Sequence, residues 1–189
     1  MTVLKTNRLV LRNWKEEDFP AFAKLNSDPR VMVYLAKCTK EESDNLAIKN
    51  KENIDKEGWG RWAVSPHDSE EFIGTIGLYP LDHETYPLPF TPTVAVAWRI
   101  AFEHWGKGYA TEGAKAVLDY GFKVLQLEEI VAYCHHEHVA SMHVMEKLGM
   151  HRNPKDDFDA NPFFKKLLVG RHVLYRITKK EWENRSNNP

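Results

Sequence analysis

The sequence predicts an α/β domain in which a mixed central sheet carries helices on both faces. The strongest evidence is the stretch 93–113, where an apolar strand pattern is followed by Gly106 and Gly108 and then by helical periodicity. Strand-like and helix-like segments also alternate along the chain, which is typical of this class. At 189 residues the chain suits one domain. We expect that domain to span residues 1–180 and a polar tail to span residues 181–189.

Charge and cysteine content argue against several classes of protein. The chain has 26 Lys plus Arg against 27 Asp plus Glu, so no global basic field favours nucleic acid or anionic membranes. Cys38 and Cys134 give no disulfide framework, and we find neither an apolar signal core nor a run long enough to span a bilayer. We therefore expect a cytoplasmic monomer or homodimer that binds neither nucleic acid nor membrane.

The N-terminal part of the chain predicts one strand and two helices. Residues 8–14 alternate apolar and polar side chains, as a strand does. Residues 15–25 place phenylalanines and a leucine near one helical face, after an acidic start that suits the helix dipole. The segment Thr39-Lys-Glu-Glu42 is similar to a capping box, which predicts a second, strongly charged helix to about Lys56.

A hairpin and a loop follow. Residues 59–64 and 72–78 have strand patterns and are joined by a polar turn, so we expect them to pair. The proline-rich stretch 80–92 is incompatible with a regular helix or a central strand. It is either a variable surface loop or part of a binding site.

The central stretch predicts a strand, an anion-binding loop and a helix. Val94, Val96 and Trp98 alternate with small residues, as in a largely buried strand. The two glycines permit a path that turns N–H groups inward, toward the N-terminus of the next helix. The inward face of that helix recurs at three- and four-residue spacing: Ala110, Ala114, Val117, Leu118, Gly121, Val124 and Leu125. Neither the dinucleotide fingerprint nor the P-loop pattern is present.

The C-terminal part predicts two strands around one helix. Residues 129–134 and 172–178 have buried-strand patterns, and residues 139–148 form a short helix that Gly149 caps. The helix face expected to point inward comprises Ala140, Val144, Met145 and Leu148. Residues 179–189 are expected to be a frayed terminus.

Three motifs resemble those of the GNAT acetyltransferase superfamily. Trp105-Gly-Lys-Gly-Tyr-Ala-Thr-Glu112 is similar to its acetyl-coenzyme A loop, in the form found in the ribosomal-protein (RimJ/RimL-like) branch. The segments 136–150 and 171–177 are similar to two further motifs, so the resemblance extends along most of the chain. It implies the GNAT fold, with a mixed sheet of about six to seven strands. In that fold two central strands splay apart and admit the pantetheine arm of acetyl-coenzyme A, the implied co-substrate.

The resemblance also implies which residues bind the cofactor. The strand positions facing the pantetheine are Val96, Trp98, Arg99 and Ile100, and the loop positions holding the pyrophosphate are Gly106, Lys107, Gly108, Tyr109, Ala110 and Thr111. The side chain of Lys107 either pairs with a phosphate or faces solvent, because backbone donors alone can suffice. His138 and Ser141 would contact the cofactor arm, and His138 stands where the family usually has asparagine.

The implied catalytic residues are Ser141, Tyr175 and His138. Ser141 either protonates the departing thiolate or caps the first turn of its helix. Tyr175 is either an acid at the same place or a core tyrosine. Ala95 stands where many relatives carry glutamate, so the amine proton would pass to water, to bulk solvent, or to a histidine among His135, His136 and His138.

A metal site is the weaker interpretation of the histidine-rich segment. Cys134, His135, His136 and His138 resemble soft ligands, but neighbouring strand residues point to opposite faces and no Cys-x-x-Cys partner exists. We expect no metal, and we expect Cys134 to be inert packing.

The resemblance implies an N-acetyltransferase that moves the acetyl group of acetyl-coenzyme A to a primary amine by direct attack. The acceptor amine would belong to a protein N-terminus or to a small molecule. The alternative is a coenzyme A-binding sensor or assembly module without catalysis. The missing carboxylate at Ala95 keeps that alternative open.

Overall fold

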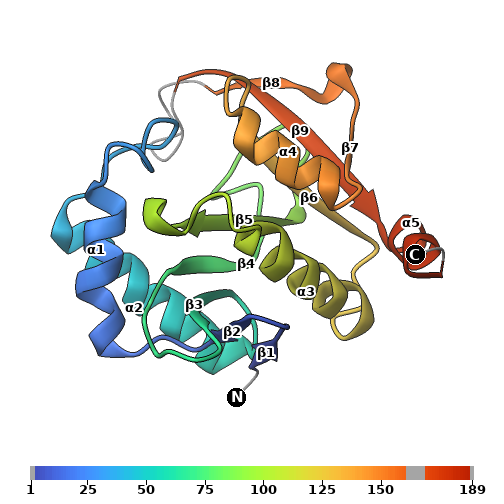
Figure 1. Cartoon of the computed structure of the whole chain (residues 1–189). Coiled ribbons are helices and arrows are strands. Elements are labelled where there is room, and N and C mark those ends of the chain that lie inside the picture. The colour runs from blue at the N-terminus through green and yellow to red at the C-terminus, as the bar shows by residue number, and fades with distance from the viewer. Residues whose placement is uncertain (1–2, 161–168, 188–189) are drawn as a thin grey trace.

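The computed structural model describes residues 3–160 and 169–187 as one mixed sheet between two layers of helices (Figure 1). The strands are β1 (Leu4–Lys5), β2 (Leu9–Arg12), β3 (Arg61–Pro66), β4 (Gly74–Leu81), β5 (Thr93–Ile100), β6 (Glu129–His135), β7 (His151–Arg152), β8 (Phe158–Ala160) and β9 (Gly170–Thr178). The helices are α1 (Phe19–Ser27), α2 (Lys40–Glu57), α3 (Tyr109–Lys123), α4 (Val139–Lys147) and α5 (Lys179–Asn187). Along the described chain, no helix is both long and apolar enough to cross a membrane.

The sheet is antiparallel except at its centre. Its strand order is β1-β2-β3-β4-β5-β6-β9-β7, and β8 also pairs with β9. β5 pairs with β4 along its whole length, and β6 pairs with β9 along its whole length. Between β5 and β6, however, the parallel ladder consists of one pair, Ala95 with Val131. The two strands therefore diverge beyond Ala95, which confirms the predicted splayed pair.

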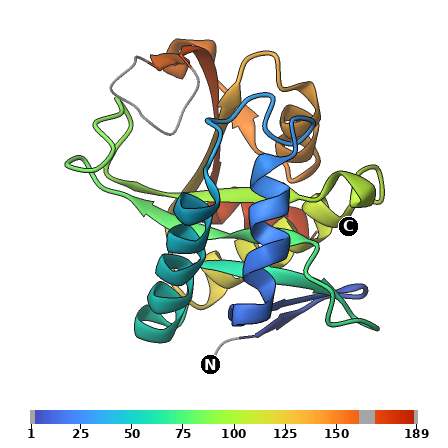
Figure 2. The same cartoon turned by 90° about the vertical axis from the view of Figure 1, so that its left-hand side faces the viewer.

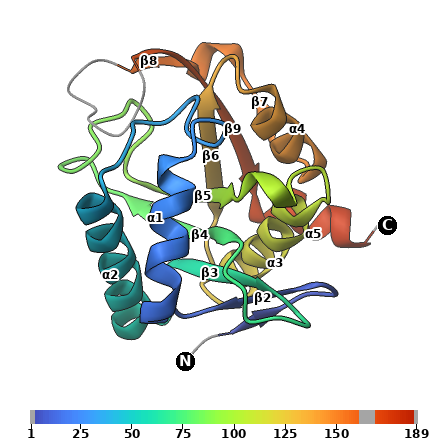
Figure 3. The same cartoon turned by 60° about the vertical axis from the view of Figure 1, so that its left-hand side comes forward.

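The helices cover the two faces of the sheet in pairs. α1 and α2 pack on one face (Figure 2), and α3 and α4 lie on the other (Figure 3). Because side chains alternate along a strand, residues 95, 97 and 99 of β5 face α1 and α2, whereas residues 96, 98 and 100 face α3. We call these the α1/α2 face and the α3/α4 face. The small Gly113 and Gly121 let α3 lie close to the sheet, against Ile76 and Ile130.

Most predicted elements are confirmed. All six expected strands and the hairpin are present, and Thr39 forms its capping box, with its Oγ1 accepting from the Glu42 N–H at 3.1 Å. Gly149 ends α4 at a φ of +79°. β1, β7 and β8 were not expected, because strands of two or three residues are too short to show alternation.

Four details of the prediction were wrong. α3 ends at Lys123, so Val124 is 61% exposed, and Ala140 in the first turn of α4 is also exposed. β4 runs on through Pro80, whose side chain is exposed. The expected frayed terminus forms α5 as far as residue 187, and residues 188–189 lie outside the described residues. Trp182 is the physical reason, since its buried indole donates to Asp119 Oδ1 at 2.8 Å and packs near Phe122.

The close approach of β3 and β4 gives a stability prediction. A Cβ at Gly77 would lie 2.0 Å from the carbonyl oxygen of Gly60 and 2.5 Å from the Cα of Arg61, neither of which can swing aside. Gly77→Ala should therefore lower the free energy of unfolding by about 3 kcal/mol or more, as overpacking does at a rigid site. Urea denaturation measures this loss. In the control variant Gly106→Ala the new Cβ meets nothing within 4 Å, so only the cost of its positive φ, about 1–2 kcal/mol, should appear. Equal losses in both variants would contradict the account.

Candidate active site

The loop between β5 and α3 has the backbone that the sequence predicts. After a short 3-10 helix over Phe102–His104, Gly106 and Gly108 take φ values of +74° and +80°. Gly108 is the residue before α3, and no side chain caps the helix there. A Cβ at either glycine would have open space or only the mobile end of Arg8 nearby. Glycine is thus needed for its backbone angles and not for room.

The same loop presents unused donors. Within the described residues, the N–H groups of residues 106–111 donate to no protein acceptor. Together with the positive end of the α3 dipole, they form a site that suits a pyrophosphate. Lys107 is exposed at the tip and has no ion pair in the described structure. The backbone, the open space and the free donors fit the phosphates of coenzyme A.

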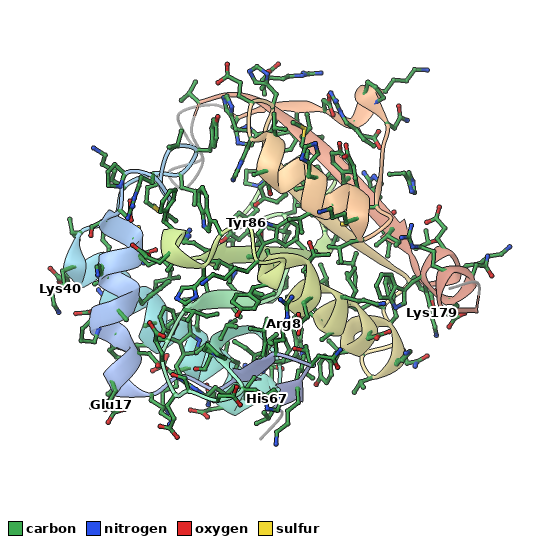
Figure 4. All side chains as sticks on the ribbon, viewed as in Figure 1. Arg8, Glu17, Lys40, His67, Tyr86 and Lys179 are labelled. Carbon is green, nitrogen blue, oxygen red and sulfur yellow. The ribbon has the colours of Figure 1, made fainter. Side chains whose placement is uncertain are left out.

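Arg8 is a further cation at this loop that sequence reasoning missed (Figure 4). Its guanidinium lies 4.9 Å from the ring centroid of Tyr109 and 2.6 Å from Glu112, in the first turn of α3. The Arg8 N–H and Thr6 Oγ1 also donate to Glu112. These contacts tie the β1–β2 turn to the start of α3, a connection that only the tertiary structure makes.

The edge of β5 leads from this loop toward the middle of the sheet. Val96 and Ile100 are buried on the α3/α4 face, and Trp98 and Arg99 are half-buried. The Ile100 carbonyl accepts from Trp105 Nε1 at 2.7 Å, so this predicted cofactor contact already has a protein partner. Beyond Ala95 the edge facing β6 is not covered by a ladder, which leaves room for an extended arm.

A cluster of rings stands where β6 ends and α4 begins. Tyr34, from the segment between α1 and α2, stacks on His138 with ring centroids 4.7 Å apart and on His135 at 5.4 Å. His172 of β9 meets His135 edge-on at 5.6 Å. Burial, and then the neighbouring His135, lower the pKa of His138 below its ordinary value. His138 is therefore neutral near pH 7. Neither Tyr34 nor His172 stood out in the sequence, because their role depends on segments far apart in the chain.

The two candidate acids, Ser141 and Tyr175, have different surroundings. Ser141 is buried in the first turn of α4, next to the thiol of Cys134. The Tyr175 hydroxyl donates to Glu146 Oε1 at 3.2 Å, and burial together with Glu146 raises its pKa. Burial also raises the pKa of Cys134 to about 12, so this thiol is inert packing, as predicted.

The residue that replaces the family's glutamate lies under two tyrosines. Tyr79 of β4 donates to the Tyr133 hydroxyl of β6 at 3.1 Å, and both rings pack on the cluster that contains Ala95. Ala95 is fully buried there, between Leu81 and Val131. The small side chain of Ala95 is thus enclosed by apolar groups and by the hydrogen-bonded tyrosine pair.

The histidine segment brings together a trio that the sequence argument did not consider. Ligand atoms of His135, His136 and Glu137 lie within 4.8 Å of one another. The side chains of His135 and His136 were expected to point to opposite faces, which was wrong: their ring centroids are 4.6 Å apart. The reason is that β6 ends at His135 and the chain turns there. The His135 Nδ1 already accepts from the Glu137 N–H at 3.3 Å. That no metal binds stays a prediction.

The loop geometry predicts how two substitutions affect acetyl-coenzyme A binding. Gly108→Val places a β-branched residue at a φ of +80° directly before α3, so affinity should fall at least about tenfold, the equivalent of the strain at such an angle. Lys107→Ala removes one exposed charge and should cost less than about fivefold. Calorimetry of both variants measures this, with circular dichroism as the control for folding. Unchanged affinity in the Gly108 variant would refute the phosphate loop.

Comparison with known proteins agrees with this geometry. A family model described as "Acetyltransferase (GNAT) domain" matches residues 8–151. The uncharacterized N-acetyltransferase YnaD of Bacillus subtilis is 32% identical over 184 residues, which are 95% of this chain and 98% of that protein. The spermidine N(1)-acetyltransferase of Escherichia coli is 28% identical over 139 residues, which are 74% of this chain and 70% of that protein.

Solved structures are also similar to this chain. A GNAT-family acetyltransferase from Bacillus anthracis has a TM-score of 0.78 and 29% identity, and the match covers 95% of this chain and 100% of that one. Since the family model spans most of the chain and YnaD matches nearly all of it, the chain belongs to the GNAT acetyltransferase family and is an acetyl-coenzyme A-dependent acyltransferase.

Proposed function

We propose that this enzyme acetylates a primary amine, of a protein N-terminus or of a small molecule, by direct attack of the amine on the thioester. The observation that carries the proposal is the single ladder pair between β5 and β6, Ala95 with Val131. Because β5 has no further ladder pair with β6, the edge of β5 between Ala95 and the donor-rich loop is left uncovered. The co-substrate supplies an activated acetyl group, and the chain has to supply a site for the amine, an oxyanion donor and routes for two protons.

The oxyanion donor is a backbone N–H near Trp98 or Arg99. Both residues lie on the part of β5 that has left β6, so their main chain is not fully occupied by sheet pairing. Such a donor is fixed by the β4–β5 ladder and needs no rearrangement during the reaction.

Ser141 is the better candidate to protonate the departing thiolate. It sits at the start of α4, beside the turn that carries His138 and next to the thiol of Cys134. The Tyr175 hydroxyl already donates to Glu146, so its proton is engaged away from the proposed thiolate. Both assignments rest on the motif resemblance, and this hydrogen bond of Tyr175 favours the serine.

His138 or a water molecule receives the proton of the amine. No carboxylate is available at Ala95, which is enclosed by apolar side chains and two tyrosines. His138 has a lowered pKa and faces Tyr34, so it is neutral and able to accept a proton at physiological pH. Direct loss of the proton to bulk solvent is the remaining route.

The acceptor class and the branch of the family are part of the same proposal. The motif from Trp105 to Glu112 supports the ribosomal-protein branch, whereas a named relative acts on spermidine, so a screen across amine classes is needed. Transfer to any amine excludes the sensor alternative. We also propose a cytoplasmic location, which the two free thiols, Cys38 and Cys134, support.

Replacement of the two candidate acids should separate their roles. Ser141→Ala should lower kcat by about 10²–10⁴-fold, the usual loss for a general acid, and leave the affinity for acetyl-coenzyme A nearly unchanged. Tyr175→Phe is the matched control, since it removes one hydroxyl of the same α3/α4 region, and it should keep near-normal turnover. Steady-state kinetics and calorimetry measure both quantities. Near-normal turnover in the Ser141 variant would mean that the thiolate leaves without this residue.

The pH profile tests His138 as the base. Its folded pKa lies below the ordinary 6.5, so kcat/KM of the wild type should rise through an inflection below pH 6.5 and rise again near the pKa of the acceptor amine. His138→Asn introduces the family's usual residue without a base and should abolish only the first inflection.

Stability must be followed in the same samples. A lowered histidine pKa contributes stability that is present above about pH 6.5 and is lost as pH falls, because the unfolded chain then binds more protons. Circular dichroism at each pH separates this loss from catalysis. Identical profiles for wild type and His138→Asn, both tracking the amine alone, would eliminate the histidine.

A further inference from the structure

Two arginines lie side by side on the α1/α2 face without a counter-ion. Arg61 of β3 stacks its guanidinium 3.8 Å from the Tyr79 ring centroid, and Arg99 of β5 donates to the amide oxygen of Asn26. Among the described residues neither guanidinium forms an ion pair, whereas Arg8, Arg12 and Arg176 each hold a carboxylate. Burial and the charge of Arg61 lower the pKa of Arg99 to about 10, which agrees with two cations sharing one site.

The position of Arg99 is fixed by both helices above it. Asn26 of α1 accepts from Arg99 and donates from its own Nδ2 to Ser43 Oγ of α2, at 2.8 Å. Asn26 and Ser43 are both fully buried. Two helices therefore hold a cation that has no anionic partner within residues 3–160 and 169–187, which is the arrangement of a prepared binding site.

A small cavity beside Arg61 and Arg99 is lined by further polar atoms that have no partner among the described residues. It has a volume of about 30 Å³ and lies between α1, α2 and the strands β3 to β5. Asn50 and Thr75 line it, and each is only 6% exposed. Their Nδ2 and Oγ1 atoms, and the Nε of Arg61, have no partner among the described residues. Leaving several buried polar groups unpaired is costly, so a ligand that satisfies them is expected.

The donor set selects the chemistry of that ligand. The two guanidinium groups and the Nδ2 of Asn50 only donate, and the hydroxyl of Thr75 donates or accepts. A planar guanidinium matches the two oxygens of a carboxylate. The cavity also exceeds the roughly 10–15 Å³ that one water-sized atom needs, so it has space for two oxygens.

The cavity lies next to the proposed reaction centre. Ala97 lines it from β5, two residues beyond the last contact with β6. The carboxylate site and the uncovered edge therefore share one strand. We propose that the acceptor is a small amine that carries a carboxylate, and that Arg61 and Arg99, with Asn50 and Thr75, bind this group while the amine faces the thioester. The assignment rests on the acetyl-transfer function proposed above, and it disfavours polycations such as spermidine.

A binding experiment tests the site without turnover. Glycine, methionine and γ-aminobutyrate are each titrated against their own carboxamides into enzyme saturated with coenzyme A. The best-bound of the three carboxylates should bind at least about tenfold more tightly than its carboxamide, as for charge-assisted hydrogen bonds. Arg61→Met and Arg99→Met should each remove most of this ratio, and Arg61→Lys should restore part of it.

Lys51→Met is the matched charge control. Lys51 follows Asn50 on α2, but its ammonium pairs with Asp55 outside the cavity, so its loss should leave the ratio unchanged. Circular dichroism and the affinity for acetyl-coenzyme A verify that each variant folds. Equal binding of all the acids and amides, or a ratio that survives both arginine replacements, would overturn the inference.

Added acetate distinguishes the acceptor's own carboxylate from a free anion. Acetate should compete with the amino acid and not affect the carboxamide. If acetate instead strengthens carboxamide binding, the site holds a separate anion and the inference is overturned. Turnover is measured separately with the same acceptors and with spermidine and 2-phenylethylamine. Failure to acetylate any of them contradicts the proposed function, whereas acetylation of amines without the carboxylate preference in binding contradicts only the inference.

Discussion

The divergence of β5 from β6 is the constraint on which the rest of the site depends. One ladder pair, Ala95 with Val131, joins two strands that are otherwise each paired on their far side. The divergence leaves main-chain groups of β5 and β6 without ladder partners in the middle of the sheet. Such groups are costly to bury without partners. β4 and β9 hold the two diverging strands in place through full-length ladders on their outer sides.

The two faces of the sheet divide the chemistry. The α3/α4 face carries the glycine loop, the start of α3 and Ser141, which are the groups proposed to meet the cofactor's phosphates and sulfur. On the α1/α2 face the two arginines, the tyrosine bridge over Ala95 and the rings around Tyr34 surround the proposed acceptor position. β5 belongs to both faces because its side chains alternate, so one strand aligns the two substrates.

The buried polar groups of the α1/α2 face lower the stability of the fold, and we propose that they are kept because they bind the acceptor. Among the described residues, two guanidiniums without an ion pair and the buried unpartnered atoms of Asn50 and Thr75 form an arrangement that a protein selected only for stability would lose. Elsewhere the same residue types are satisfied, as in the nearly buried pair of Arg12 and Asp18. The contrast supports the proposed acceptor side of the site independently of any motif.

The sequence by itself determined what depends on local pattern. It specified the six main strands, the capping box at Thr39, the positive φ at Gly108 and the family, because propensity, periodicity and a short motif lie within a few residues of one another. The tertiary structure decided what depends on distance in the chain. Trp182 turned an expected frayed end into a helix by finding Asp119.

The candidate site divides in the same way. From the sequence alone, Arg99 was expected only as a strand position next to the cofactor. Its neighbour Arg61 lies 38 positions earlier in the sequence, and only the pairing of β3, β4 and β5 brings the two arginines together. Tyr34, between α1 and α2, and His138, just before α4, likewise meet only in the folded chain. Local free energies fix the elements, whereas the relative placement of side chains from different elements is set by the packing of the whole domain.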